Sequence, residues 1–95
     1  MNWAMVIAAI LELIQTLQKN KDEETLLRRM ASPRIHEFRV IMGALYDKGL
    51  RGRELISTTR EAMEEMRAMN RDEHVALLAT AKDFEPGMLA SELEG

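Results

Sequence analysis

Apolar residues recur along this chain at steps of three and four residues, the spacing that places side chains on one face of an α-helix. The pattern predicts five helices, at about residues 2–19, 22–30, 33–46, 53–69 and 73–84. The alternation of apolar and polar residues that is typical of β-strands is absent. The sequence therefore predicts an all-α fold, a compact bundle of four to five short helices.

Short polar breaks between these segments indicate where the helices begin and end. Asp22 is expected to cap the second helix, Ser32 followed by Pro33 to begin the third, and Asp72 to cap the last. Gly49 suits the left-handed backbone conformation in which many helices terminate.

The chain has 95 residues, which is enough for one hydrophobic core, and no linker-like segment divides it. We expect a single helical domain over residues 1–87 and a short acidic tail over residues 88–95. Cysteine is absent, which excludes disulfides, thiolate zinc sites and cysteine nucleophiles. This usage fits a reducing compartment, so a cytoplasmic location is expected.

The first predicted helix, residues 1–19, is the most apolar part of the chain. Its broad apolar face consists of Trp3, Val6, Ile7, Ile10, Ile14 and Leu17. The opposite face is barely polar over its first half, so the helix needs cover on more than one side.

Three interpretations of this helix remain open. It contacts a second copy or a larger complex, it is an ordinary core helix of its own domain, or it lies on a membrane surface. The first is favoured because a chain of five short helices is expected to bury only one face of each. The apolar run is too short to span a bilayer. A membrane-surface helix would carry Lys or Arg on its polar face, where only Lys19 is available.

Charge is spread unevenly along the chain. The net charge is −3, yet residues 25–60 hold eight Lys or Arg against three Asp or Glu. This basic middle raises the hypothesis that the protein contacts nucleic-acid phosphates through Arg51, Arg53, Arg60 and Arg67. Against it, Glu64 stands at the i,i+4 and i,i+3 spacings from Arg60 and Arg67 that are typical of solvated surface pairs.

The stretch Gly49-Leu50, followed by Arg53-Glu54-Leu55-Ile56, resembles the middle of bacterial helix-turn-helix domains. The resemblance covers about ten residues and implies a turn before a short helix. In those domains a second turn and a recognition helix follow. Here residues 55–69 are expected to form one continuous helix instead.

No motif in the chain indicates catalysis. The two histidines, His36 and His74, do not form a helical zinc motif, and no glycine-rich phosphate loop occurs. We expect no enzymatic activity, no cofactor, no metal site and no small-molecule substrate. The leading hypothesis is a non-enzymatic helical interaction protein: a self-assembling subunit, an adaptor or a protein-binding inhibitor that uses its first helix as the main contact. Nucleic-acid binding through the basic middle and peripheral membrane binding through the first helix are the alternatives.

Overall fold

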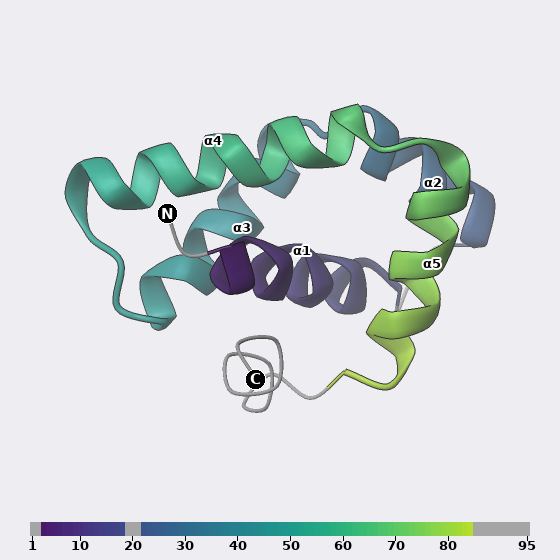
Figure 1. Cartoon of the computed structure of the whole chain (residues 1–95), viewed down its shortest axis with the longest axis horizontal. Helices are drawn as coiled ribbons and strands as arrows, with labels where there is room; N and C mark the ends of the chain where they lie inside the picture. The colour runs from purple at the N-terminus through teal and green to yellow at the C-terminus, as the bar shows by residue number, and fades with distance from the viewer. Residues whose placement is uncertain (1–2, 19–21, 85–95) are drawn as a thin grey trace.

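The computed structural model describes residues 3–18 and 22–84, and the regular structure within those ranges is entirely helical. The helices are α1 (Trp3–Gln18), α2 (Glu23–Ala31), α3 (Ile35–Asp47), α4 (Gly52–Ala68) and α5 (Arg71–Lys82) (Figure 1). The predicted all-α bundle is confirmed. The predicted acidic tail, residues 88–95, lies outside the described residues.

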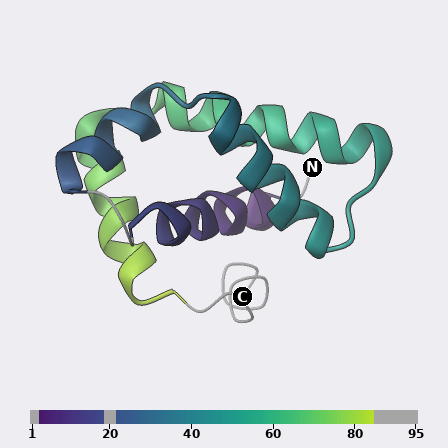
Figure 2. The ribbon, with the colours of Figure 1, turned by 180° about the vertical axis from the view of Figure 1, so that it is seen from behind.

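Helix α1 lies at the centre of the bundle, and each of the other four helices packs against it. Figures 1 and 2 show α2 and α5 together at the end of the bundle where α1 finishes, with the connection from α3 to α4 at the opposite end. Ala8 and Ala9 are buried on one side of α1, and Ile10 and Ile14 are buried on the other. The apolar residues of α1 are thus covered on more than one side by its own chain, while Trp3 and Thr16 stay exposed.

The other helices each contribute an apolar stripe to the same core. These stripes are made of Leu26, Leu27 and Met30 on α2, Ile41 and Leu45 on α3, Ala62, Met63 and Met66 on α4, and Leu78 and Ala81 on α5. Among the described helices, none combines the length and apolar content that crossing a membrane requires.

Two of the predicted helix ends are confirmed. The Asp22 carboxylate caps α2 by accepting the backbone N–H of Thr25 at 2.8 Å. Gly49 has a φ angle of 105°, in the left-handed region, and directly follows Lys48, the last capping residue of α3.

Two predicted helix starts are wrong. Ser32 does not begin α3; it closes α2, donating its backbone N–H to the Arg28 carbonyl at 3.0 Å, and α3 starts only at Ile35. Asp72 lies inside the first turn of α5, whose cap is Asn70. Asn70 is the better cap because its side chain accepts the N–H of Glu73 while the Glu73 carboxylate accepts the N–H of Asn70.

Candidate anion-binding site

The residues predicted to form a protein interface on the first helix belong, with one exception, to the core of the protein itself. Ile7 is half-buried against that core, and the fully or nearly fully buried ones are Val6, Ile10, Ile14 and Leu17. Trp3 alone stays half exposed, at 51%. The face that was expected to meet another protein or a membrane is therefore covered by α2 to α5. This burial agrees with the core-helix interpretation of α1.

The four arginines that the sequence singled out for nucleic acid are not gathered at one place. The Arg51 guanidinium lies over the Tyr46 ring, 3.5 Å from its centroid, and donates to the backbone carbonyls of Tyr46 and Leu50, both at 2.7 Å. This side chain is therefore held at the connection between α3 and α4. Arg53 is exposed in the first turn of α4.

Arg60 and Arg67 share a hollow of about 310 Å³ that we call the Phe38 hollow. It is lined by Phe38, Arg60, Met63, Glu64 and Arg67. Phe38 and Met63 give it an apolar floor, since both pack into the core. No ion pair joins Glu64 to Arg60 or Arg67 among the residues that the structure describes. The surface pairs that the spacing predicted are thus not formed, and the Glu64 carboxylate lies in the same hollow as two unpaired guanidinium groups.

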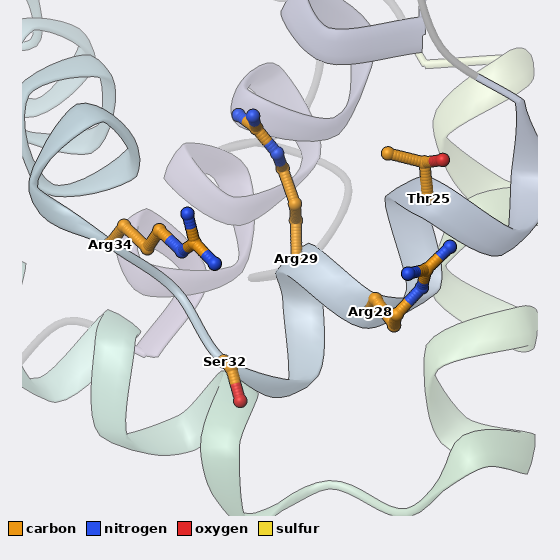
Figure 3. A pocket seen from close by; sticks show the side chains of 5 residues that line it. All are labelled: Thr25, Arg28, Arg29, Ser32 and Arg34. Carbon is orange, nitrogen blue, oxygen red and sulfur yellow. The ribbon is translucent and has the colours of Figure 1, made fainter.

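A second hollow, of about 370 Å³, lies where α2 ends and α3 begins (Figure 3). We call it the arginine hollow. Its lining is Thr25, Arg28, Arg29, Ser32 and Arg34. No carboxylate lines it, whereas each of the three other hollows described on the surface includes at least one carboxylate-bearing residue. The lining therefore carries only positive charge and hydroxyl groups.

One of the three guanidinium groups, that of Arg29, is held by an ion pair with a buried carboxylate. Arg29 donates from Nη1 to Glu37 Oε1 at 3.2 Å, and the Glu37 side chain is only 1% exposed. The other carboxylate oxygen, Oε2, accepts the backbone N–H of Arg34 at 3.1 Å. Glu37 therefore neutralises the charge of Arg29 and ties the end of α2 to the start of α3.

The other two guanidinium groups are unpaired. Within the described part of the chain, the Arg28 and Arg34 side chains make neither an ion pair nor a hydrogen bond, and both residues are exposed. The charge of Arg28 acts on Asp22, the capping residue at the start of the same helix. Hydrogen bonds from the Thr25 backbone and then from its side chain are the main causes that lower the pKa of Asp22, and the field of Arg28 lowers it further. The hollow thus keeps two positive charges that no contacting carboxylate cancels.

Local helix energetics explain the presence of Arg28 and Arg29 but not of Arg34. Basic residues in the last turn of α2 interact favourably with the negative end of the helix dipole. Arg34 occupies the capping position at the start of α3, where the dipole is positive and where a Ser, Thr, Asp or Asn is preferred. Its side chain has no oxygen to accept a helix N–H. A residue that opposes its local environment in this way is typical of a functional site.

The arrangement can hold an anion by charge and hydrogen bonding. It offers no recognised catalytic group. Among the described residues, no three His, Cys, Asp or Glu side chains are close enough to bind a metal ion. His36 is exposed, and His74 is buried with a ring nitrogen 2.7 Å from the Met66 carbonyl oxygen, so the two histidines do not meet.

No family model, no curated protein sequence and no solved structure matches this chain. The proposed function therefore depends only on the arrangement of the side chains in this structure. The arginine hollow was not predictable from the sequence, because its residues come from one helix and from the connection to the next. One signal was present in the sequence: three arginines stand within seven positions, on either side of Pro33.

Proposed function

We propose that this protein is a non-enzymatic binding module that docks an acidic segment of a partner protein on the face formed by α2, α3 and α4. The observation that carries the proposal is the placement of Arg34. It is an unpaired cation at a helix start, where it costs stability, and it lines a hollow that carries only positive charge.

The two hollows support this proposal because each includes a residue from the first two turns of α3 or its cap, Arg34 in one and Phe38 in the other. Phe38 donates its backbone N–H to the Arg34 carbonyl at 3.1 Å, so Arg34 and Phe38 are one helical turn apart on α3. A partner segment lying across this turn meets a cationic site and then an apolar one. Interfaces combine these two elements, an apolar seat and a few well-placed charged groups.

A protein partner fits this face better than a nucleic acid does. Glu64 lies in the Phe38 hollow, where it would repel a run of phosphates that continued from the arginine hollow. The apolar floor made by Phe38 and Met63 gains nothing from a phosphate backbone, but it can bury an aliphatic side chain. The four arginines of the nucleic-acid hypothesis also include Arg51, which is held at Tyr46.

The proposal is tested by fluorescence anisotropy with a labelled hexaglutamate peptide. We expect binding that the same peptide extended by two leucines makes tighter, because the extension reaches the Phe38 hollow. Arg34→Ala is expected to weaken binding of both peptides. Arg53→Ala, which removes another exposed arginine from the far end of α4, is expected to leave binding unchanged.

Two results would contradict the proposal. If a single-stranded oligonucleotide of the same charge binds more tightly than either peptide, the basic middle serves nucleic acid instead. If Arg34→Ala and Arg53→Ala weaken the peptides equally, binding reflects overall charge and the hollow has no special part. Light scattering adds a check on the partner: a dimer that Arg34→Ala dissociates would make the partner a second copy of this chain.

A further inference from the structure

We infer that the arginine hollow is a site for a phosphomonoester, namely the phosphate of a phosphorylated side chain on the partner protein. This inference rests on the function proposed above, since it specifies the group that the partner presents to Thr25, Arg28, Arg29 and Arg34.

The charge of the hollow matches a phosphomonoester. Three guanidinium groups line it, and Glu37 neutralises one of them through its contact with Arg29. Two positive charges remain, on Arg28 and Arg34. A phosphorylated side chain carries a charge of about −1.5 to −2 at neutral pH, whereas a carboxylate or a phosphodiester carries only one negative charge. The phosphomonoester is therefore the biological anion that balances the site.

The donors that line the hollow come from α2 and from the cap of α3, and Arg29 stands between the other two arginines in Figure 3. Figure 3 shows the Arg34 side chain pointing from the start of α3 toward α2, where Thr25 and Arg28 lie three positions apart on one helix face. Both unpaired guanidinium groups are free to turn toward an anion between them, and the fork of N–H donors on each matches phosphate oxygens. The Thr25 hydroxyl already donates to the Asp22 carboxylate, so the two arginines are the donors that the site offers. The Ser32 hydroxyl is directed away from the guanidinium groups in Figure 3, so we do not count it.

The buried ion pair makes the site rigid on one side. Arg29 cannot leave without exposing the charge of Glu37, which is covered by the core. It therefore fixes the part of the lining that lies between Arg28 and Arg34. The volume of about 370 Å³ holds a phosphate together with the side chain that bears it.

The test compares three alanine-flanked five-residue peptides that differ only in the central residue, which is phosphoserine, glutamate or serine. Binding is measured by isothermal titration with the full chain. We expect the phosphoserine peptide to bind at least about ten-fold more tightly than the glutamate peptide, because each added charge-assisted hydrogen bond is strong. Arg28→Ala and Arg34→Ala are each expected to remove most of that difference, and Arg53→Ala is expected to preserve it.

The outcomes separate this inference from the proposed function. If the phosphoserine and glutamate peptides bind equally and Arg34→Ala weakens both, the phosphate inference is wrong and the acidic-segment function stands. If neither of these peptides binds while hexaglutamate does, the phosphate inference alone is wrong; if hexaglutamate also fails to bind, both are wrong. A 5′-phosphorylated oligonucleotide and vesicles containing phosphatidic acid present the same group from other sources. Tighter binding to either of them than to the phosphoserine peptide would overturn the assignment to a protein partner.

Discussion

Replacing Ile10 with alanine tests whether α1 is the centre of the fold. Ile10 has no exposed surface and lies in the core shared by all five helices. The substitution removes three carbon atoms, worth about 2.4 kcal/mol at about 0.8 kcal/mol per buried methylene. Because four helices surround the site and cannot all close on it, a residual cavity raises the expected loss to about 3–4 kcal/mol. This is a large part of the about 5–14 kcal/mol expected for a chain of this length.

The chain offers a matched control in Ile35. It is the same residue type and is 68% exposed at the first position of α3, so Ile35→Ala is expected to change stability by less than about 0.5 kcal/mol. Urea unfolding followed by circular dichroism measures both variants. Ile10→Ala is expected to lower the midpoint by about 2 M, for a urea dependence of about 1.5–2 kcal/mol per M.

Two results would show that α1 is not the centre of the core. A loss of less than about 1 kcal/mol for Ile10→Ala, or equal losses for both variants, would mean that the core does not depend on α1. If light scattering instead showed that Ile10→Ala converts an oligomer into a folded monomer, α1 would be an interface after all. Thermal unfolding followed by circular dichroism distinguishes this case, because a monomer with a core defect unfolds at a lower temperature than a monomer that has only lost an interface.

Three further predictions concern α2 and α3. Gly43→Ala is expected to raise the free energy of unfolding by about 0.5–1 kcal/mol, because an added Cβ meets nothing within 4 Å; a lower urea midpoint would contradict this. Asp22 has a pKa below its ordinary value of 3.8, chiefly because it accepts the Thr25 N–H, so its contribution is present above about pH 4 and is lost as the pH falls through that lowered pKa. Asp22→Asn keeps the cap without the titration, so its acid unfolding curve is expected to be flatter than that of the parent, and identical curves would contradict the assignment. Glu37→Gln is expected to cost about 1–3 kcal/mol in urea unfolding while hexaglutamate binding is kept or strengthened, because Arg29 loses its neutralising partner; weaker binding would show that the hollow needs Glu37 for its shape.

The fold was largely predictable because helical periodicity depends only on local spacing. Each of the five predicted segments corresponds to a helix, and the errors lie at helix ends, where several residues could serve as caps. Asn70 and Asp72 are both suitable caps, and the choice depends on which of them has a glutamate three positions later in the chain. Ser32 could have begun α3 or ended α2. Ser32 ends α2 because that helix continues through Ala31.

The role of α1 was not predictable from the pattern of its residues. A helix that is apolar on nearly all sides needs cover, but periodicity does not indicate whether that cover comes from the same chain. The assumption that each helix buries one face fails here, because four helices surround a fifth. Ala8 and Ala9 allow neighbours to approach α1 on the side that appeared unpartnered.

The candidate site was predictable only in its charge. The sequence indicates a basic middle segment, yet it assigns nucleic-acid contact to Arg51 and Arg53, which lie at the α3–α4 end of the bundle, away from α2. The arginine hollow depends on the connection between α2 and α3, whose geometry is set by Glu37 bonding to both sides of it. A buried glutamate cannot be recognised from its neighbours in the sequence.

The central claim is that the partner docks at the arginine hollow and not on α1. It is tested most directly by nuclear magnetic resonance of the arginine side-chain Nε–Hε groups during a titration with hexaglutamate. We expect the signals of Arg28 and Arg34 to shift first and furthest, with Arg53 and Arg71 nearly unchanged. Equal shifts of all arginines, or shifts confined to the backbone of α1 near Trp3, would contradict it.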